Sequence, residues 1–482
     1  MEQTGTYPHP TSAAKLDVII VGAGLSGLAA AIAISLSGHS VTVYEAAKEL
    51  QEVGAGLQIT PNSSRILQKW DLNPRLWSSA AIPSFLQVHR FSGEVLMTDP
   101  RFDVSMRSRY GAPFADIHRV DLQQALYQRA SDLGVSFKLG QRVESLDPDA
   151  GEITTASGAT ARADLVVAAD GLRSRCRDVF VPDGEGTKPT GDLAYRIVLH
   201  VDDIDDAELR RWVRDVSVHF WIGPGAHAVG YSLRGGTVYN IVLLVPDDLP
   251  EGVDRQPGSV EQMRTLFRDW DPILNRFLGQ VRGVDQWKLL YRSELPSWVN
   301  DKSNLVFIGD SCHPMLPYLA QGANSAIEDG TVLGLLLGHL GSKDQLPKAL
   351  QMYQKLRKTR GDAIVRETFK QRHAFHMPDG PEQEARDEIF AAHRRGEPIV
   401  PPFPSRWSCP TVQSWLYGYD AFQEVAEAPP SEPKRELAAI DIYGGAFMLG
   451  PSDLVSKDQL KDCLSRGWVV FVPNKMTVGP RT

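Results

Sequence analysis

The sequence predicts an α/β protein, in which a domain built on a parallel sheet carries an inserted domain of antiparallel strands and is followed by a C-terminal helical region. Three observations support this fold class. Residues 16–45 have the pattern of a strand, a glycine-rich turn, a helix and a second strand. Residues 164–171 and 304–310 are two later apolar runs that end in Asp or Gly. Residues 193–245 are rich in β-branched side chains and glycine turns, as antiparallel sheets are.

The parallel sheet is predicted to begin with an apolar strand at residues 16–21, which the turn sequence GAGLSG follows. The alanine-rich segment after this turn predicts a helix that ends at Gly38, and residues 39–45 predict the next strand. A strand, a helix and a strand in this order predict a parallel arrangement. The two later apolar runs join the same sheet, and sheets of this kind bind ligands at the carboxyl ends of their strands.

The later part of the chain is predicted to be helical over residues 325–376. Eight Lys and Arg residues fall within residues 348–372. No aromatic residues interleave with them as base stacking would need, so they indicate a solvated helix face more than a nucleic-acid or membrane surface. Residues 424–436 read EVAEAPPSEPKRE, which is the composition of a linker.

Composition and charge exclude several classes of protein. The 482 residues carry a net charge of −8, so there is no overall basic field for nucleic acid. Four cysteines without a CxxC pair argue against a disulfide scaffold and a metal site, and indicate a reducing, cytoplasmic location. Residues 18–36 contain no charge, but their glycines interrupt them, so no membrane span is expected. No secretory signal precedes them.

The GAGLSG turn has the spacing of a dinucleotide-binding motif. Gly22 permits the tight turn, Gly24 lets the backbone approach a pyrophosphate, and Gly27 lets the helix pack closely on the strand. The N-terminus of the following helix offers free N–H groups to phosphate oxygens. Glu45 can accept hydrogen bonds from ribose hydroxyls and repels a 2′-phosphate, so the nucleotide held here is not expected to be NADP. A glycine-rich turn without a ligand is the alternative.

Three blocks of sequence together resemble one family, and they read GAGLSGLAAAIAISLSGHSVTVYE, DLVVAADGLRSRCR and LVFIGDSCHPMLPYLAQGANSAIEDG. The chain is similar to the single-component FAD-dependent aromatic hydroxylases, the group of p-hydroxybenzoate hydroxylase, and especially to its salicylate hydroxylase-like fungal members. The resemblance covers residues 16 to about 420. It implies a Rossmann-type FAD-binding domain of the p-hydroxybenzoate hydroxylase kind, with an inserted substrate-binding sheet.

Domain boundaries follow from this resemblance and from the composition of the two ends. The expected parts are a flexible tail at 1–15, a discontinuous FAD-binding domain at 16–190 and 285–375, a substrate-binding β-sheet domain at 191–284, a helical or irregular segment at 376–423, a linker at 424–436, and a partial α/β-hydrolase-like remnant at 437–482. The remnant reads YGGAF where esterases carry an oxyanion loop, but the chain contains no GxSxG nucleophile motif, so no hydrolase activity is expected.

The resemblance implies tightly bound FAD as cofactor and NAD(P)H as a transient co-substrate. Arg119 resembles the arginine that reaches the FAD diphosphate, Asp310 the aspartate that binds the ribityl chain, and Asp170 the aspartate of a motif that serves both nucleotides. The three glycines and Glu45 would hold the AMP half, and the remaining positions line the flavin. The implied cofactor-binding residues are Gly22, Gly24, Gly27, Glu45, Gly56, Arg119, Asp170, Asp310, Gly322 and Ala323. No metal ligands are implied.

Several of these residues have a structural alternative. Asp170 and Asp310 each follow an apolar strand, where an aspartate is often a helix N-cap, and Arg119 could form an ion pair. His313 lies before a proline and is expected to hold its loop rather than perform chemistry. Cys312 is expected to be an inert thiol in apolar surroundings.

The candidate catalytic residues lie in the predicted antiparallel sheet. Arg196 follows a tyrosine on its first strand, and His227 and Tyr231 stand four residues apart in HAVGY. Oxygen transfer from a flavin hydroperoxide is an electrophilic attack, which a deprotonated phenol favours. Arg196 is expected to stabilise a phenolate or carboxylate, Tyr231 to hydrogen-bond the phenol oxygen, and His227 to accept a proton. A structural histidine between strands is the alternative for His227.

The resemblance therefore implies an FAD-dependent monooxygenase that uses NAD(P)H and O2 to hydroxylate a phenolic or hydroxybenzoate-like aromatic, salicylate-like or polyketide-derived, through a flavin C4a-hydroperoxide. Secondary metabolism is the implied setting. The alternative is a flavin-dependent dehydrogenase or oxidase without oxygen insertion. The expected partners are the small aromatic substrate, O2 and NAD(P)H, with no nucleic acid and no membrane, and the sequence leaves a homodimer open.

Overall fold

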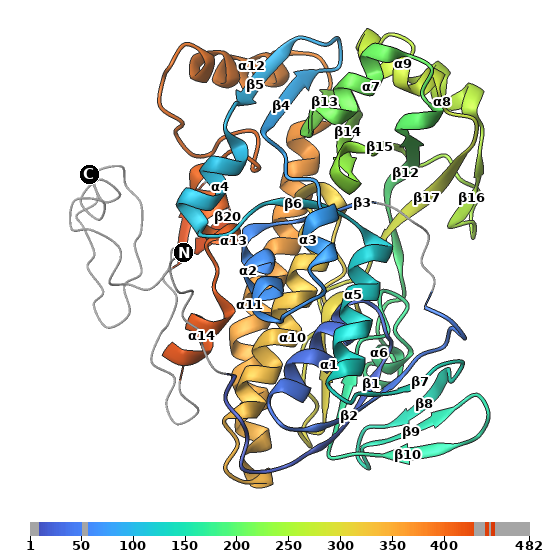
Figure 1. The fold of residues 1–482 in the computed structure, drawn as a ribbon, viewed down its shortest axis with the longest axis vertical. Helices are drawn as coiled ribbons and strands as arrows, with labels where there is room; N and C mark the ends of the chain where they lie inside the picture. The colour runs from blue at the N-terminus through green and yellow to red at the C-terminus, as the bar shows by residue number, and fades with distance from the viewer. Residues whose placement is uncertain (1–8, 51–55, 429–438, 443–444, 449–482) are drawn as a thin grey trace.

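The computed structural model describes residues 9–50, 56–428, 439–442 and 445–448, and Figure 1 shows their arrangement. The parallel sheet lies at the lower end of the molecule in this view, and a larger antiparallel sheet lies at the upper end. The helix α11 (Leu346–Phe375) runs along the molecule from one end towards the other. The predicted fold class is confirmed: an α/β domain with a parallel sheet, an antiparallel sheet domain and helices towards the C-terminus.

The parallel sheet has five strands in the order β18-β11-β1-β2-β7. All four pairings are parallel, as the strand–helix–strand pattern predicts. β1 and β11 are buried and apolar because they occupy the middle of the sheet. The strands are β1 (Asp17–Val21), β2 (Ser40–Tyr44), β7 (Ser136–Lys138), β11 (Leu165–Ala168) and β18 (Leu305–Phe307).

Two helices of this domain touch through their backbones. α1 (Leu25–Leu36) packs against α10 (Gly322–Gly338), and two glycines of α10 allow the contact. A Cβ at Gly330 would lie 2.5 Å from the backbone N of Ala30, and a Cβ at Gly334 would lie 2.5 Å from the backbone C of Ala33. This close contact brings the start of α10 to the carboxyl ends of the strands, where the glycine turn lies.

The antiparallel sheet has eight strands in the order β16-β17-β12-β15-β14-β13-β4-β5. Its outer face packs against α7, α8 and α9 in a core that includes Leu209, Met263 and Phe277. Its inner face supplies Val218 and Phe220 to a second core with α4 and α11. The elements are β4 (Phe85–Arg90), β5 (Val95–Asp99), β12 (Lys188–His200), β13 (Ser217–Gly223), β14 (Ala226–Leu233), β15 (Val238–Pro246), β16 (Arg255–Gly258), β17 (Val284–Tyr291), α4 (Phe102–Tyr110), α7 (Ala207–Arg214), α8 (Val260–Leu266) and α9 (Pro272–Gly279).

The extent of this sheet differs from the boundaries predicted for the substrate domain, 191–284. β4 and β5 belong to the sheet although they lie within residues 16–190, and β17 continues into residues 285–291. β4 pairs in parallel with β13, with Phe85 opposite Ser217. Local sequence patterns indicate a strand but do not identify a partner so far along the chain, and this is why the prediction missed these strands.

The basic residues of α11 also differ from the prediction of a solvated face. Arg357 and Arg360 are buried and contact the carboxylates of Glu328 and Asp329 on α10. Arg372 contacts Asp192 of β12. Three of the eight basic side chains of residues 348–372 therefore bind α11 to other elements instead of facing solvent. Charge spacing along a helix shows which face a residue occupies, but not what packs against that face.

The remaining elements connect the two sheets or cover their edges. A three-stranded antiparallel sheet, β10-β9-β8, lies beside the parallel sheet, and β3 pairs with β6, which contacts β14 of the antiparallel sheet. The predicted C-terminal segment 376–423 contains two helices and the start of a third. These elements are β3 (Gly56–Ile59), β6 (Ala115–His118), β8 (Val143–Asp147), β9 (Glu152–Thr155), β10 (Thr160–Arg162), α2 (Pro61–Lys69), α3 (Arg75–Ser79), α5 (Arg119–Asp132), α6 (Arg175–Phe180), α12 (Pro381–Arg394), α13 (Pro410–Tyr417) and α14 (Ala421–Glu427), with 3-10 helices η1 (Val201–Asp203), η2 (Arg234–Gly236), η3 (Gly309–Ser311), η4 (Pro317–Leu319) and η5 (Lys343–Gln345).

The two ends of the chain are described only in part. Residues 9–15 differ from the predicted flexible tail, because Ser12 N donates to Ser37 O at 3.1 Å and Ala13 N donates to Leu340 O at 3.0 Å. Residues 1–8 of that tail lie outside the described residues, as do 429–436 of the predicted linker. Of the predicted hydrolase-like remnant, β19 (Ala439–Ile442) and β20 (Gly445–Met448) are described and pair antiparallel, and the rest lies outside.

The uncharged stretch at residues 18–36 forms β1 and α1. Among the helices that the structure describes, none has the length and apolar character needed to cross a membrane.

Candidate active site

The glycine turn after β1 is held by contacts that only glycine permits. Gly22 has a φ of +104°, and a Cβ there would lie 2.5 Å from Ala169 O. A Cβ at Gly27 would collide with Gly22 O. Gly24 is different, because a Cβ there would meet no heavy atom within 4 Å. Two glycines are therefore required by the packing of the chain itself, whereas Gly24 opens onto free space.

Glu45 fixes the shape of this turn. Its Oε2 accepts a hydrogen bond from Ala23 N at 2.7 Å, and its Oε1 accepts one from Ala47 N at 2.8 Å. The carboxylate is thus held at the carboxyl end of β2, beside the N-terminus of α1, as the motif predicts.

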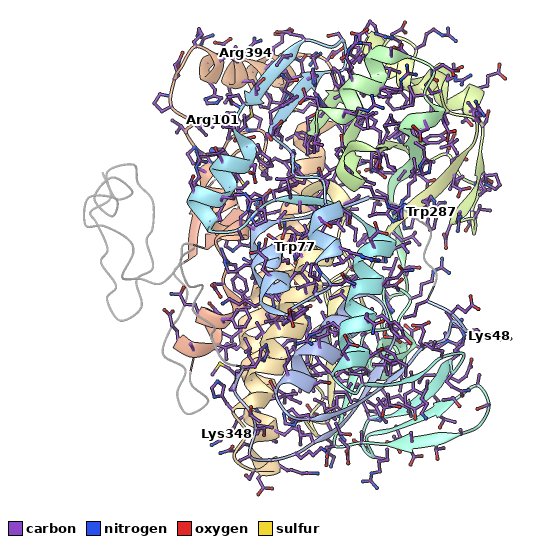
Figure 2. All side chains as sticks on the ribbon, viewed as in Figure 1. Lys48, Trp77, Arg101, Trp287, Lys348 and Arg394 are labelled. Atoms are coloured by element: carbon purple, nitrogen blue, oxygen red, sulfur yellow. The ribbon has the colours of Figure 1, made fainter. Side chains whose placement is uncertain are left out.

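A cavity of about 330 Å³ connects the glycine turn to the inner face of the antiparallel sheet. It receives residues from both domains and from the loop between β18 and α10. The structure brings together nine predicted site residues around it, namely Gly24, Gly56, Arg119, Arg196, His227, Tyr231, Asp310, Gly322 and Ala323. Gly22, Gly27, Glu45 and Asp170 do not line it. Figure 2 shows the dense packing of side chains between the sheets that surrounds this region.

Asp170 has the capping role that the sequence left open. Its Oδ1 accepts a hydrogen bond from Ser174 Oγ at 2.5 Å, and its Oδ2 accepts one from Cys176 N at 3.1 Å. Ser174 in turn caps α6 by accepting from Arg177 N. Both carboxylate oxygens thus accept hydrogen bonds from residues at the start of α6. The next residue, Gly171, lines the cavity. A contact between Asp170 and the cofactor stays a prediction.

Three charged side chains meet in the cavity. Arg119 begins α5, Arg196 lies on β12, and Asp310 lies in η3. Burial and the neighbouring charge of Arg196 lower the pKa of Arg119, which the charge of Asp310 opposes. Burial also raises the pKa of Asp310, against the opposing effect of His313 and Arg119. Asp310 nevertheless has accessible surface, because it opens onto the cavity in the interior.

The guanidinium of Arg196 contacts an aromatic ring, and among the described residues it has no acidic partner. Its guanidinium carbon lies 4.9 Å from the ring centre of Trp287, and that of Arg255 lies 4.2 Å from the same ring centre. Arg255 is neutralised by Asp285 at 2.8 Å. Among the described residues no ion pair or hydrogen bond joins the Arg196 side chain to a carboxylate. Burial lowers the pKa of Arg196, which is the expected effect on a cation without a counter-ion.

Tyr231 closes the end of the cavity near β3. A Cβ at Gly56 would lie 2.5 Å from its ring, so only glycine fits opposite it. Burial raises the pKa of the phenol, and the nearby carboxyl of Asp116 raises it further, while Arg196 opposes both. Tyr231 is therefore a neutral hydrogen-bonding group at any physiological pH.

His227 lies towards the other end of the same strand. It is buried, and its Nδ1 lies 2.7 Å from Nε2 of His376, the residue that follows α11. Burial and the facing His376 ring hold the pKa of His227 well below its usual range. A strand rises about 3.3 Å per residue, so the Cα atoms of His227 and Tyr231 are about 13 Å apart with Val229 between them. The two side chains thus line the cavity at separate points along β14, and their contacts with a substrate stay a prediction.

Sequence reasoning missed several residues of the site. Tyr318 and Trp407 line the cavity, and Trp287 and His376 contact the lining residues Arg196 and His227. Tyr318 lies within the third of the quoted sequence blocks but has no role in the resemblance, and the other three come from segments without a recognisable motif. Alternation along β17 indicates the face of the sheet that Trp287 occupies, but not its partner. In the described part of the chain, no group of three or more His, Cys, Asp or Glu side chains is placed to hold a metal ion.

A buried charge network holds the loop that carries Asp310. Asp329 accepts hydrogen bonds from Gly309 N at 2.9 Å, from His313 Nε2 at 2.5 Å and from Arg357 Nε at 2.8 Å. His313 thus has the structural role expected of it. Burial would raise the pKa of Asp329, but the charges of His313 and Arg357 and these hydrogen bonds lower it to about 2. Cys312 beside it is buried, which raises its pKa and leaves an unreactive thiol.

Acid is expected to destabilise the protein through Asp329. Its folded pKa of about 2 lies below the ordinary aspartate value of 3.8, so its stabilisation is complete above about pH 4 and is lost as the pH falls towards 2. The loss is on the order of 2 kcal/mol, because one pKa unit is worth about 1.4 kcal/mol. Urea denaturation at about pH 5 and about pH 3 measures the first half of this loss, about 1 kcal/mol. The Asp329→Asn variant is expected to lose less stability between these two pH values than the wild type, and equal losses would contradict the assignment.

Comparison with known proteins places the chain in a family. The family model described as FAD binding domain matches residues 15–368. The chain is 50% identical over 411 residues to the FAD-dependent monooxygenase OpS4 of Beauveria bassiana (strain ARSEF 2860), which covers 84% of this chain and 95% of the relative. It is 31% identical over 411 residues to the 3-hydroxybenzoate 6-hydroxylase of Polaromonas naphthalenivorans (strain CJ2), covering 84% of this chain and 97% of the relative.

Two solved structures have the same fold. CtdE in complex with FAD and a substrate matches with a TM-score of 0.72 at 22% identity, over 86% of this chain and 97% of that chain. A salicylate hydroxylase substrate complex matches with a TM-score of 0.70 at 20% identity, over 87% of this chain and 99% of that chain. The family match over most of the described chain and the similarity of its full-length relatives lead to one conclusion: the chain belongs to the FAD binding domain family of flavin-dependent enzymes.

Proposed function

We propose that this FAD-dependent monooxygenase uses NAD(P)H and O2 to hydroxylate a phenolic or hydroxybenzoate-like aromatic ring. One observation carries the proposal. The cavity joins the glycine turn at the end of β1 to an apolar chamber in which Arg196 has no recorded acidic partner among the described residues. An enclosed cation of this kind favours an anionic or ionisable aromatic ligand. The printed names of relatives, which include a 3-hydroxybenzoate 6-hydroxylase and a hispidin-3-hydroxylase, support the same class of reaction.

The residues at the glycine-turn end of the cavity fit FAD. Gly24 leaves open space where a diphosphate would pass, and Arg119 supplies a positive charge. The carboxylate of Asp310 faces the cavity and can accept hydrogen bonds from ribityl hydroxyls. The N-terminus of α10, at Gly322 and Ala323, offers N–H groups and favours negative charge. When bound, FAD supplies the hydride-accepting and O2-activating chemistry that the side chains of this protein lack.

The substrate end of the cavity is mainly apolar. Its lining of Ala194, Phe220, Val229, Val242, Leu244, Leu289 and Trp407 presents hydrocarbon and aromatic surface to an aromatic ring. Such a lining excludes water, which protects a reactive oxygen species from hydrolysis and strengthens the charges of the site.

Three polar residues complete this chamber and have separate roles in the proposal. Arg196 stabilises the phenolate or carboxylate of the substrate, because a phenolate ring is more electron-rich and reacts faster with an electrophilic oxygen. Tyr231 donates a hydrogen bond to a substrate oxygen at the β3 end. His227 is neutral at neutral pH, since its pKa is lowered, so it has a free lone pair with which to accept a proton at the other end.

NAD(P)H is proposed as a reductant that binds and leaves. The sequence contains one GxGxxG turn after a strand, and FAD takes it. The segment around Gly171 and Arg173 is the proposed approach for the reduced nicotinamide. Gly171 lines the cavity, and Arg173 is largely exposed and contacts Asp254.

Gly24→Val is expected to lower the affinity for FAD by about tenfold or more. The valine side chain would fill the space left for the diphosphate, whereas no protein atom lies within 4 Å to be disturbed, so the apoprotein should keep its stability. Flavin absorbance after reconstitution and the unfolding temperature of the apoprotein measure the two effects. Gly186→Val is the matched control, because Gly186 also has no neighbour within 4 Å and does not line the cavity. Unchanged FAD affinity in Gly24→Val would show that the diphosphate lies elsewhere.

Stopped-flow reduction separates the proposal from a flavin dehydrogenase or oxidase. The FAD-loaded protein is mixed anaerobically with NADPH or NADH in the presence of salicylates and resorcinol-type phenols. In a hydroxylase of this kind, one phenol is expected to accelerate flavin reduction. Equal reduction rates with and without every phenol of the panel would favour the alternative.

A further inference from the structure

Two buried histidines meet between the antiparallel sheet and the end of α11. Nδ1 of His227 lies 2.7 Å from Nε2 of His376, and the ring centres are 4.9 Å apart. His227 lines the cavity, whereas His376 does not and stands behind it. At this distance one ring donates a hydrogen bond to the other. The tautomer of His376 therefore determines whether Nε2 of His227 carries a proton or a free lone pair.

The second nitrogen of His376 has no hydrogen-bond partner among the described residues, although it is buried. Each neutral ring carries one proton, so the pair has two arrangements. In one, His376 holds its proton on Nδ1 and accepts from His227 Nδ1, which leaves the lone pair of His227 Nε2 free to act as a base. In the other, His376 donates from Nε2, and His227 presents an N–H on its own Nε2. A buried pair with two available arrangements can move a proton without moving an atom of the backbone.

The surroundings of His376 favour the protonated form of this residue over that of His227. His376 directly follows the last residue of α11, a helix of 30 residues, where the partial negative charge of the helix end stabilises a cation. Four titratable or charged groups face it: His227 from β14, Asp192 from β12, Tyr318 from η4 and Arg372 from α11. Asp192 favours the charged form of His376 and Arg372 opposes it, and burial outweighs both, so the pKa of the unliganded residue is lowered to about 4.

We propose that His376 stores the proton that His227 removes from the phenolic substrate, so that the two histidines act as one reversible base. The inference rests on the proposed function, since it concerns the ionisation of a phenol in this cavity. His376 is a positioning residue, which acts on the substrate through His227 and does not touch it. Because its backbone oxygen also accepts a hydrogen bond from Gly225 N at 3.0 Å, the residue is tied to the start of β14.

The proton transfer balances without any other reactant. The phenolic O–H bond breaks and its proton bonds to Nε2 of His227. The proton on Nδ1 of His227 passes to Nε2 of His376, which becomes doubly protonated while the substrate becomes a phenolate in the cavity that Arg196 also lines. The steps reverse when the product phenolate takes a proton from His227, and both rings return to their starting tautomers. A phenolate and a cation arise together inside the protein, so the net charge of the site stays constant.

The test uses the FAD-loaded protein and 4-nitrophenol, whose phenolate absorbs visible light, without NAD(P)H. The fraction of bound nitrophenol present as phenolate is followed against pH in the wild type, in His376→Gln and in His376→Phe. Glutamine can still hydrogen-bond His227 Nδ1 but cannot hold a proton. His89→Gln is the matched control, because His89 and His219 form another buried histidine pair, at 3.0 Å on the same sheet, that does not line the cavity.

His376→Gln is expected to keep its FAD content and to bind the phenolate form with nearly wild-type affinity at alkaline pH. Its ionisation midpoint for bound nitrophenol should move up by about one pH unit or more, which is a tenfold loss of basicity. The midpoint in His376→Phe should move up at least as far, and the midpoint in His89→Gln should equal that of the wild type. A midpoint in His376→Gln equal to that of the wild type would overturn the proposal, and so would a fall in affinity at every pH without a shift of the midpoint.

Nuclear magnetic resonance of the wild type with ¹⁵N-labelled histidine provides the second measurement, which does not depend on any variant folding. His313 is charged in its pair with Asp329, so the unliganded protein already has one doubly protonated imidazole. One further imidazole is expected to become doubly protonated when 4-nitrophenol binds. A complex with no more doubly protonated imidazoles than the unliganded protein would contradict proton storage. Neither measurement requires turnover, so the two proposals can fail separately. A protein that ionises nitrophenol through His376 but inserts no oxygen into any phenol would contradict the proposed function and still support proton storage by His376.

Discussion

The Arg196→Ala variant is expected to keep its FAD. Its kcat/KM for phenol-stimulated NAD(P)H oxidation should fall by roughly 10- to 100-fold, which corresponds to the free energy of a hydrogen bond to a charged group. The guanidinium is held against Trp287 and has no recorded acidic partner among the described residues, so its removal leaves no protein charge unpaired. The folded state should therefore be little affected, while a bound phenolate loses its cation. Stopped-flow rates at saturating and subsaturating phenol measure the two constants.

The control for this variant is Arg255→Ala. Arg255 also contacts the ring of Trp287, but it is paired with Asp285 at the surface and does not line the cavity, so its loss should change the kinetics little. Arg196→Lys should fall between the wild type and the alanine variant, because lysine keeps the charge but not the planar stacking. Loss of FAD from Arg196→Ala would show that this residue serves the cofactor and that the substrate anion binds elsewhere.

Asp329→Ala is expected to lower the free energy of unfolding by about 3–5 kcal/mol, because it leaves buried charges without their partner. Arg357 is completely buried and loses one of its two acidic partners, and His313 loses the carboxylate that its Nε2 contacts. The loop at Gly309 also loses its contact, so FAD affinity should fall as well. Chemical denaturation of the FAD-loaded and FAD-free forms separates the two losses.

Arg366→Ala is the matched control for the charge network. Arg366 lies on the same helix as Arg357, but its pair with Glu294 is about half exposed on both sides. Surface pairs of this kind contribute about 0–1 kcal/mol. Asp329→Ala is expected to lower the free energy of unfolding more than Arg366→Ala does. Equal losses would show that the buried network does not hold the Asp310 loop.

The parts of the site that could be predicted from sequence are those whose function depends on local spacing. Gly22, Gly24 and Gly27 lie at fixed offsets after an apolar strand, and each offset has a separate steric reason. Asp310 follows a second such strand, and parallel strands bring their carboxyl ends to one edge of a sheet. These residues therefore meet around one cavity, although about 290 positions separate Gly24 from Asp310.

The parts that could not be predicted depend on which distant surfaces meet. His376 follows a helix with no motif of its own, and nothing local indicates that its ring faces His227. The partner of Arg196 is an aromatic residue of β17, about 90 residues later in the chain, so a search for acidic partners does not find it. The spacing of HAVGY indicates that His227 and Tyr231 share a face of their strand, about 13 Å apart, but not which residues pack around each ring.

The measurement that tests the central claim most directly is a single turnover in ¹⁸O2. The FAD-loaded protein is reduced anaerobically with NAD(P)H in the presence of the phenol that best accelerates reduction, and is then mixed with ¹⁸O2. The account predicts one ¹⁸O atom in the hydroxylated product and reoxidised flavin. Reoxidation that yields hydrogen peroxide alone, with unchanged phenol throughout the panel, would contradict it.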